Sequence, residues 1–397
     1  MIRKVRDEYM NIGLFGFDFV SSNKGCEALT YTFLSMIERI CADNKVVIYN
    51  FTYNDSLGKI PERYPNFKFE YVKINLKNPK YWITARNILS KCNAFFDATF
   101  GDGFSDIYGE KWNIKTDLIK QMVIWCKVPL ILVPQTYGPY NNHKLEKWAM
   151  NIIRTSSLVY SRDNLSAKKL KEKADIDIKV ASDMAFKLPY QETFYDLKSD
   201  KIKVGINISS LLCDIDWAKS NHFGLTVNYQ EYHNKVIEEL IRQGKYEIHI
   251  IPHVIDLEHP DSRENDYRIC LKFKKKYGDR VIIAPPFETP IEAKSYISNM
   301  DIFIGSRMHA TIGAISSGVA TIPFSYSRKF EGLYGNIDYP YVISARSIST
   351  EEALINTQKW IDSYEQLQKK GKECVSNSIK KLDVFEQDIL NVLKGRK

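Results

Sequence analysis

Short apolar runs alternate with longer amphipathic segments along most of the chain, which is typical of parallel strands joined by helices. In the first half, this pattern predicts strands near residues 10–17, 46–51, 69–74, 94–100, 129–134, 158–161 and 178–181. The helical period between them predicts helices over 25–42, 80–91, 114–126, 142–155 and 164–173. We therefore expect a doubly wound α/β domain over residues 1–190.

A second set of similar units follows residues 188–203, a polar stretch that contains a proline and is typical of a linker. Strands are predicted near 203–209, 246–252, 280–284, 301–305 and 320–325, and helices over 229–243, 262–276, 290–298, 309–317 and 328–335. The fold class is therefore α/β, with two Rossmann-like doubly wound domains, 1–190 and 203–345, facing a cleft. The tail, residues 346–397, is predicted to form two helices that pack back onto either domain.

Composition places the chain among ordinary globular proteins, since 44% of its 397 residues are hydrophobic and 26% are charged. The formal charge of +8 is too diluted for a nucleic-acid protein and fits either a small anionic substrate or contact with an acidic membrane surface. The seven cysteines are odd in number and form no C-x-x-C pair, which argues against disulfides and zinc. Because no apolar run approaches the ~18 residues that span a bilayer, we expect a cytoplasmic protein.

Side chains suited to anions follow two neighbouring predicted strands in the second domain. Ser306, Arg307 and His309 come directly after the strand at 301–305, in the first turn of a small-residue helix. Lys329 follows the strand at 320–325. Any one of these residues could be a helix cap or a surface charge, but their joint placement predicts a site for a carboxylate or phosphate.

The first predicted strand leads into the loop DFVSSNKGCEAL, where Asn23 opens a helix. Such a loop suits the close approach of a ligand to the backbone. It has neither a G-x-G-x-x-G nor a Walker sequence, so it does not signal a nucleotide. Asp18 and Glu27 fit equally well as ordinary residues of a turn and a helix start.

Carboxylates and further cations also follow predicted strands. Asp102 lies between two glycines in FGDGFSDIYG, which leaves its carboxylate uncrowded for a general base. Both Asp102 and Asp106 could instead cap the turn that follows. Arg162 is the strong cation that the first domain places at its ligand edge, and His253 is the matching candidate from the second domain.

The ordered motifs NKGCEAL, GDGFSDIYG, QTYGP, YSRDNLS, ASDMAF, KVGINIS, IIPHV and GSRMHATIGAISSGVATIPFSYSRK resemble the polysaccharide pyruvyl transferase family over roughly residues 10–340. The Arg-x-His segment is the most specific of them. The resemblance implies a GT-B-like fold and transfer of a pyruvyl group from phosphoenolpyruvate to two hydroxyls of one sugar. A cyclic ketal and phosphate would be the products, in capsule or exopolysaccharide biosynthesis.

The resemblance also implies roles for individual residues. Arg162, Arg307 and Lys329 match family positions credited with binding phosphoenolpyruvate, with His309, Ser306 and Asn23 beside them. We expect His309 to act as acid or phosphate partner and Asp102 as base, with Arg307 in the catalytic set. Because Arg307 and His309 should be partly exposed, we expect their replacement by alanine to spare the fold. No step of this chemistry calls for a metal.

Cys26 departs from the family pattern, because many members have an acidic residue there; Glu27 is the candidate to replace it. Two other functions remain open: a GT-B glycosyltransferase that uses a nucleotide sugar, with Glu331 as a ribose-binding acid, and a non-catalytic anion-binding relative. Family members often act on lipid-linked saccharides. The resemblance therefore implies a polyprenyl-linked acceptor and peripheral contact with the inner face of the cell membrane. Lys369, Lys370, Lys372, Lys380 and Lys381 of the predicted terminal helices are compatible with such contact, but they also fit ordinary solvated helix faces.

Overall fold

The computed structural model describes residues 9–53, 56–214, 221 and 223–395. The chain forms two compact units, described separately below. Unit 1 comprises Met1–Val20, Leu29–Met184 and Lys380–Lys397, and unit 2 comprises Ser21–Ala28 and Ala185–Ile379. Helices α1 (Lys24–Ile40) and α14 (Tyr364–Lys394) each contribute residues to both units. The domain limits 1–190, 203–345 and 346–397 stay a prediction from the sequence.

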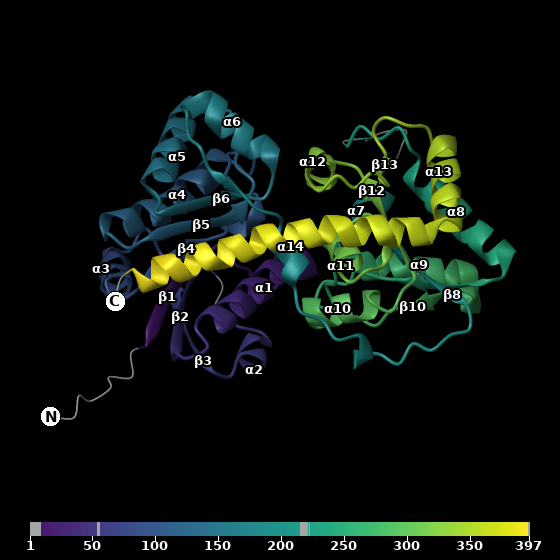
Figure 1. Cartoon of the computed structure of the whole chain (residues 1–397), viewed down its shortest axis with the longest axis horizontal. Coiled ribbons are helices and arrows are strands. Elements are labelled where there is room, and N and C mark those ends of the chain that lie inside the picture. The colour runs from purple at the N-terminus through teal and green to yellow at the C-terminus, as the bar shows by residue number, and fades with distance from the viewer. Residues whose placement is uncertain (1–8, 54–55, 215–220, 222, 396–397) are drawn as a thin grey trace. The chain divides into compact units, whose positions relative to one another are not determined.

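Unit 1 contains a parallel sheet of seven strands in the order β3-β2-β1-β4-β5-β6-β7 (Figure 1). The strands are β1 (Met10–Phe15), β2 (Val46–Thr52), β3 (Phe67–Lys73), β4 (Ala94–Asp97), β5 (Leu130–Gln135), β6 (Leu158–Ser161) and β7 (Lys179–Val180). The helices between them are α2 (Ile60–Arg63), α3 (Pro79–Leu89), the 3₁₀ helix η1 (Thr99–Gly101), α4 (Glu110–Trp125), α5 (His143–Thr155) and α6 (Asn164–Ala174).

The core of unit 1 lies on both faces of this sheet, because its central strands are buried on both sides. One face packs Phe95 and its neighbours against α3, α4 and α5. On the other face, Phe96 meets Phe33 of α1 with their ring centroids 4.9 Å apart. At the far edge, Phe385 of α14 packs against Tyr160 of β6.

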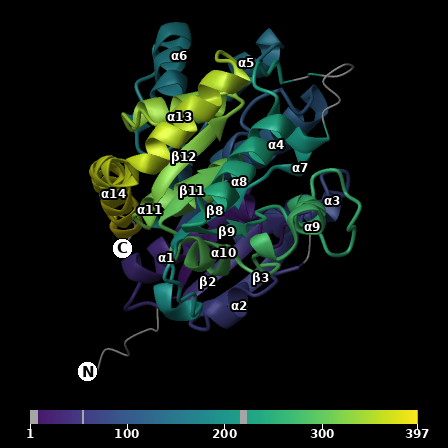
Figure 2. The ribbon, with the colours of Figure 1, turned by 90° about the vertical axis from the view of Figure 1, so that its right-hand side faces the viewer.

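Unit 2 repeats this design with six parallel strands in the order β10-β9-β8-β11-β12-β13 (Figure 2). The strands are β8 (Ile202–Asn207), β9 (Tyr246–Ile250), β10 (Ile282–Ile283), β11 (Ile302–Gly305), β12 (Ala320–Ser325) and β13 (Ile343–Ser344). The helices are η2 (Met184–Lys187), η3 (Glu192–Phe194), α7 (Ser210–Cys213), α8 (Tyr229–Gln243), α9 (Asp266–Tyr277), η4 (Gly278–Arg280), α10 (Pro290–Ile297), α11 (Met308–Ser316), α12 (Arg328–Asn336) and α13 (Thr350–Asp362).

Alternate residues of the unit 2 strands enter two different hydrophobic clusters. Ile302 and Ile304 belong to the cluster with α8, α9 and α13. Phe303, between them, belongs to the cluster with α10 and α11. This alternation is what a strand covered by helices on both faces requires, and Figure 2 shows α8 and α13 side by side.

Local capping fixes where the helices of unit 2 begin. The side chains of Asn228, Asn265 and Thr289 each accept a hydrogen bond from a backbone N–H in the first turn of α8, α9 and α10. Ser349 and Glu352 form a reciprocal capping box at the start of α13. The predicted tail of two helices is therefore confirmed as α13 and α14.

The strand orders place a switch point in each sheet, between β1 and β4 in unit 1 and between β8 and β11 in unit 2. Doubly wound sheets bind ligands outside the carboxyl ends of the strands at such points. Several predicted boundaries differ from the structure by a few residues, and the strand expected over 94–100 ends at Asp97. It ends there because Thr99 and Phe100 adopt positive φ angles of 37° and 57°, which no strand allows.

Candidate functional site

The switch point of the unit 2 sheet is built around Asn207, the last residue of β8. Its side-chain nitrogen donates to the backbone oxygen of Ile251 at 2.9 Å, and its side-chain oxygen accepts from the backbone N–H of Arg307 at 2.8 Å. Asn207 is fully buried. It therefore fixes the turn through which the chain leaves β11 and enters α11.

Arg307 is held by the buried carboxylate of Asp266. Its Nε lies 3.3 and 3.1 Å from the two carboxylate oxygens, and its Nη2 lies 2.8 Å from Oδ1 and 3.0 Å from the backbone oxygen of Glu264. Burial alone would lower the pKa of Arg307, but the charge and hydrogen bonds of Asp266 outweigh burial and raise it above its ordinary value. Within the described part of the chain, Nη1 is the nitrogen left open to a bound anion.

Arg307 is less accessible than the sequence suggested, with only 9% of its surface exposed. The expectation that its replacement by alanine would spare the fold needs correction for this reason. Removing it would leave Asp266 as a buried charge without its ion-pair partner.

Asp266, at the start of α9, connects several segments of unit 2. Its Oδ1 also accepts the backbone N–H of Ser210 at 3.0 Å, and its Oδ2 accepts those of His253 and Val254 at 3.3 and 3.0 Å. The sequence analysis missed Asp266. Its signal, an acid in the first turn of a helix, is the same as that of many ordinary helix starts.

Ser306 is fully buried next to Arg307. The hydroxyl of Tyr229 donates to the Ser306 oxygen at 2.7 Å, and it accepts the backbone N–H of Ser209 at 2.8 Å. The Ser306 side chain is therefore positioned by the core, with its own hydroxyl hydrogen left to donate.

His309, in the first turn of α11, packs against the backbone of Gly25. A Cβ atom on Gly25 would lie 2.4 Å from the Nδ1 atom of His309, so no side chain fits there. His309 itself is half-buried. The glycine in the NKGCEAL motif therefore allows the histidine and the start of α1 to approach closely.

Asn23 links the same loop to the segment after β9. Its side-chain oxygen accepts the backbone N–H of Gly25 at 3.0 Å, and its backbone forms an antiparallel bridge with Val254. The N–H of Lys24 also donates to the backbone oxygen of His253 at 3.1 Å. Unit 2 thus brings Asn23, Ser306, Arg307 and His309 into one connected network.

Glu27 and Cys26 have different surroundings in this loop. The Glu27 carboxylate accepts the N–H of Ser21 at 2.7 Å and the ammonium of Lys24 at 2.9 Å, so it serves as a structural anchor in the loop. Lys329 is exposed at the start of α12. Partial desolvation of its ammonium by the surrounding protein lowers the pKa of Lys329, and the nearby Cys26 opposes this shift.

In unit 1, the backbone after β4 is strained. Thr99, Phe100 and Gly101 have consecutive φ angles of 37°, 57° and 86°. Each such angle costs a non-glycine residue roughly 1–3 kcal/mol, and strain of this kind gathers at functional sites. It turns the chain sharply just before Asp102.

Asp102 is half-buried, and its two carboxylate oxygens lie 3.1 and 3.0 Å from the hydroxyl of Tyr108, which donates to them. Aromatic rings lie in the segments beside it: the Trp112 ring is 5.6 Å from that of Phe100 and 6.3 Å from that of Tyr53. A partly exposed carboxylate near aromatic faces can accept a proton from a sugar hydroxyl.

Arg162 lies at the same edge of unit 1. Its Nη1 donates to the Asp183 carboxylate at 2.9 Å, and its Nε donates to the Thr136 hydroxyl at 2.9 Å. A Cβ atom on Gly101 would lie 3.3 Å from this Nη1. Unit 1 therefore places Arg162 beside the turn that carries Asp102.

The carboxylate of Asp106 is held by hydrogen bonds to the backbone of another loop. Its carboxylate accepts the backbone N–H groups of Asn141 and Asn142 at 2.6 and 2.8 Å, and the Asn141 side chain at 3.2 Å. Only 6% of its surface is exposed. These bonds tie Asp106 to the loop before α5 rather than to the turn that follows it, which is where the sequence suggested a cap.

A small buried cavity in unit 2 adds a residue that the sequence analysis did not single out. Lys294 of α10 lines it together with His253 and His309. In the sequence, Lys294 belongs to PIEAKSYI and looks like a lysine on the surface of a short helix. Its burial depends on how α10 packs, which local sequence does not report.

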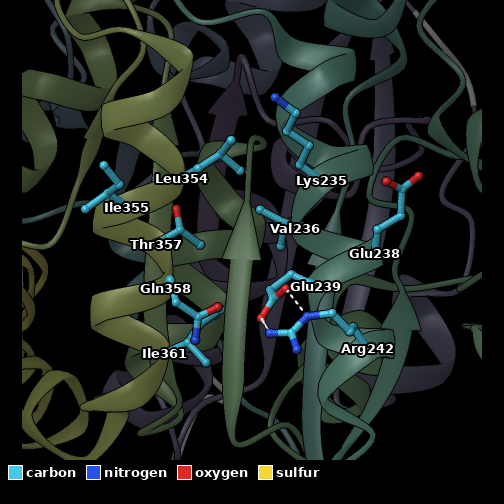
Figure 3. Close-up of a pocket in the computed structure, with 10 residues that line it drawn as sticks. All are labelled: Lys235, Val236, Glu238, Glu239, Arg242, Leu354, Ile355, Thr357, Gln358 and Ile361. Atoms are coloured by element: carbon cyan, nitrogen blue, oxygen red, sulfur yellow. Dashed lines mark hydrogen bonds and ion pairs between the residues drawn. The ribbon is translucent and has the colours of Figure 1, made fainter.

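A larger groove in unit 2, between α8 and α13, lacks the chemistry of an anion site. Figure 3 shows its aliphatic floor, with Leu354 and Ile361 on α13 facing Val236 on α8. The cation Arg242 is paired with Glu239, at 2.8 and 2.6 Å between their atoms. No set of cations converges among the residues that line it.

No group of three or more His, Cys, Asp or Glu side chains in the described residues could hold a metal ion. Among these residues we also find no helix with the length and apolar character needed to cross a membrane.

The sequence model of the family described as "Polysaccharide pyruvyl transferase" matches residues 23–328. The chain belongs to the polysaccharide pyruvyl transferase family. The resemblance found from the motifs is thereby confirmed, and Asn23, Asp102, Arg162, Arg307 and His309 all lie inside the matched range. No curated protein sequence matches the chain.

Solved structures show the fold of this pyruvyl transferase family member. The UDP-GlcNAc 2-epimerase of Neisseria meningitidis, bound to UDP-GlcNAc, aligns with a TM-score of 0.59 at 11% identity, covering 96% of this chain and 100% of that one. The S. aureus MnaA–UDP structure aligns at 0.55 and 11%, covering 92% and 91%. The trehalose 6-phosphate synthase of Burkholderia multivorans aligns at 0.53 and 6%, covering 98% and 99%. These neighbours confirm the predicted GT-B-like α/β fold.

Proposed function

We propose that this family member transfers a pyruvyl group from phosphoenolpyruvate to two hydroxyls of one sugar in a polysaccharide or lipid-linked saccharide precursor. The products would be a cyclic pyruvate ketal and phosphate. The observation that carries the proposal is Arg307, which Asn207 and Asp266 hold at the switch point of the unit 2 sheet beside His309. The family match supplies the reaction class.

The donor is strongly anionic, with about three negative charges near pH 7 on its carboxylate and phosphate groups. We assign its binding to Arg307, His309 and Lys329, with Ser306 and Asn23 beside them, and Arg162 as a further cation. A planar guanidinium that is already oriented loses little freedom on binding and matches the geometry of a carboxylate or phosphate. Asp266 supplies this orientation for Arg307.

The reaction needs an acid and a base. His309, as imidazolium, would protonate the methylene carbon of phosphoenolpyruvate, which creates positive character at the carbon that bears the phosphate. Asp102 would take the proton of the first sugar hydroxyl as its oxygen adds to that carbon. The phosphate then leaves, and the second hydroxyl closes the ring. Of the two hydroxyl protons, one is balanced by the new methyl group and the other by hydrogen phosphate.

Each of these proton transfers is worth about 10² to 10⁴-fold in rate. The fixed positive charges would contribute the larger share by stabilising the departing phosphate. This scheme assigns no step to a metal, so we expect the activity to survive treatment with a chelator. For a lipid-linked acceptor, the exposed Lys369 and Lys372 of α14 are candidates for contact with an anionic membrane surface.

The test measures phosphate release from phosphoenolpyruvate in the presence of a panel of mono- and disaccharide acceptors, followed by mass spectrometry of the sugar product. We expect phosphate release only with an acceptor that carries two suitably placed hydroxyls, and a pyruvate ketal on that sugar. Phosphate release without sugar modification would contradict the proposal.

Two other functions predict different results in the same samples. A glycosyltransferase would be stabilised against heat by a nucleotide sugar and not by phosphoenolpyruvate. A non-catalytic relative would be stabilised by phosphoenolpyruvate but would release no phosphate with any acceptor.

A further inference from the structure

The buried cavity in unit 2 has an unusual lining. Its three polar side chains, His253, Lys294 and His309, are all bases. The other residues that line it are Ala28, Ala185, Leu188, Pro290, Ile297 and Gly313. About 10 Å³ of space remains between them, which is room for about one water molecule. No acidic side chain belongs to this lining.

Lys294 is the most buried of these bases, with 2% of its surface exposed. Its ammonium donates to the backbone oxygen of Leu188 at 2.9 Å and lies 4.9 Å from the centre of the Tyr190 ring. Neither partner carries a negative charge. Burial lowers the pKa of Lys294 to about 7, so the amine exchanges its proton near neutral pH.

His253 has two ring nitrogens without a hydrogen-bond partner among the described residues, although only 4% of the residue is exposed. Burial, together with the charges of His309, Arg307 and Lys24, holds its pKa well below the ordinary value. A neutral ring with unpaired buried nitrogens calls for a water molecule, and the cavity it lines offers space for one.

Charged groups on the surrounding segments are mostly paired with one another. Lys24 of α1 pairs with Glu27, and Arg307 of α11 pairs with Asp266 of α9. Glu292 of α10 accepts hydrogen bonds from the backbone N–H of Glu288 and the hydroxyl of Thr289. Other charged residues on or next to these segments are Lys187 of η2, Glu192 of η3, Glu264, Glu288 and Lys329. None of these side chains lines the cavity.

We infer that this cavity takes up a proton when an anion binds at His309, and that Lys294 is a positioning residue that sets how readily His309 becomes protonated. The inference rests on the proposed function, in which the anion is phosphoenolpyruvate. Like charges that share a small buried space repel each other, so a proton on one of these bases opposes a proton on another. A bound anion of about three negative charges stabilises a second proton.

The proton comes from solvent, and the chemistry is a simple protonation: an N–H bond forms on Lys294 or His309, and hydronium becomes water. The consequence concerns the timing of catalysis. His309 would become a good acid only when the anionic donor is present, and Lys294 competes with it for the proton at all other times.

The first experiment needs no turnover. Protein labelled with ¹³C-histidine is titrated by NMR, and the His309 signal is assigned by its loss in His309→Asn. In Lys294→Met, which keeps the stem but removes the base, we expect the titration midpoint of His309 to rise by about one pH unit. The matched control Ile297→Val alters packing in the same cavity without removing a base, and its midpoint should equal that of the wild type.

An unchanged His309 midpoint in Lys294→Met would overturn the inference. If Lys294→Met fails to fold, Lys294→Gln provides the same loss of charge with a polar end. A midpoint that moves equally in Ile297→Val would also overturn it, because the effect would then come from packing.

The second experiment measures proton uptake during binding of phosphoenolpyruvate, by calorimetry at pH 8 in Tris and in HEPES, whose heats of ionisation differ. We expect the wild type and Ile297→Val to take up close to one proton per donor bound, and Lys294→Met to take up half as much or less. Equal uptake in wild type and Lys294→Met would overturn the inference. Absence of any donor binding, with a shifted His309 midpoint, would instead overturn the proposed donor and support the coupling inside the cavity.

Discussion

Arg307 donates hydrogen bonds from Nε and Nη2 to the fully buried carboxylate of Asp266, over distances from 2.8 to 3.3 Å. The same carboxylate accepts three backbone N–H groups from two other segments. Orientation of the guanidinium is therefore built into the core of unit 2, and a ligand does not have to create it. Substitutions at the two positions should separate binding from folding.

Arg307→Lys keeps the positive charge but loses the planar fork, so we expect the Kd for phosphoenolpyruvate to rise about 10- to 100-fold. Calorimetric titration of the donor measures this change. Asp266→Asn instead leaves a buried cation without its counter-charge and should lower the free energy of unfolding by about 3–5 kcal/mol in urea denaturation. Unaltered donor affinity in a folded Arg307→Lys protein would contradict the role of the guanidinium.

Gly25→Ala should disturb His309 through direct contact, because the new Cβ would lie 2.4 Å from the Nδ1 atom. We expect phosphate release to fall by at least tenfold as the imidazole is displaced. The control is Gly332→Ala in α12, where no atom lies within 4 Å of the added Cβ. That variant should keep its activity and gain up to about 1 kcal/mol of stability. Equal activity in both variants would show that the contact does not matter.

Asp102→Asn and Asp106→Asn should fail in different ways. Loss of the proposed base at Asp102 should lower kcat about 10² to 10⁴-fold, with little change in the melting temperature or in the KM for phosphoenolpyruvate. Asp106→Asn weakens bonds to the backbone of Asn141 and Asn142 and should cost about 1–3 kcal/mol of stability. Steady-state kinetics and thermal unfolding of the two variants, side by side, decide between catalytic and structural roles.

Lys294 should make the protein less stable as the pH falls from 10.5 towards 7. Its pKa is about 7 when folded and about 10.5 when unfolded, so between these values the unfolded chain binds a proton that the folded chain does not. The resulting loss in the free energy of unfolding grows as the pH falls from 10.5 to 7 and levels off below pH 7. Lys294→Met lacks it, so the stability of this variant relative to wild type should be about 2 kcal/mol higher at pH 8 than at pH 10. Urea unfolding of both proteins at the two pH values measures the difference, and a gap independent of pH would contradict the assignment.

Much of the fold follows from local pattern. The alternation of apolar runs with helical periods predicts both sheets, because a buried parallel strand and an amphipathic helix have different periods in any sequence. The strand at Ala94–Asp97 shows the limit of this pattern. The residues after Asp97, ATFG, are as apolar as a continuing strand, but the positive φ angles of Thr99 and Phe100 end it. Only the packing around the turn reveals those angles.

The sequence likewise predicts only some residues of the candidate site. Arg307 and His309 could be found because they follow a strand directly, and position after a strand is visible in sequence. Asp266 and Lys294 could not, because each lies in a helix whose local signal is ordinary, and their importance comes from segments distant in sequence. Asp266 meets Arg307 across 41 positions of the chain, and Lys294 meets Leu188 across 106.

Ser21–Ala28 belongs to the second unit and Lys380–Lys397 to the first, which matters for the choice of truncated proteins. A fragment cut near residue 190 would not be self-sufficient on either side. The downstream piece would lack Gly25, which packs against His309. The upstream piece would lack Phe385 and the Asp388 carboxylate, which accepts a hydrogen bond from the Tyr160 hydroxyl. Each unit includes a segment from the other side of residue 190, so each completes its own core only in the intact polypeptide.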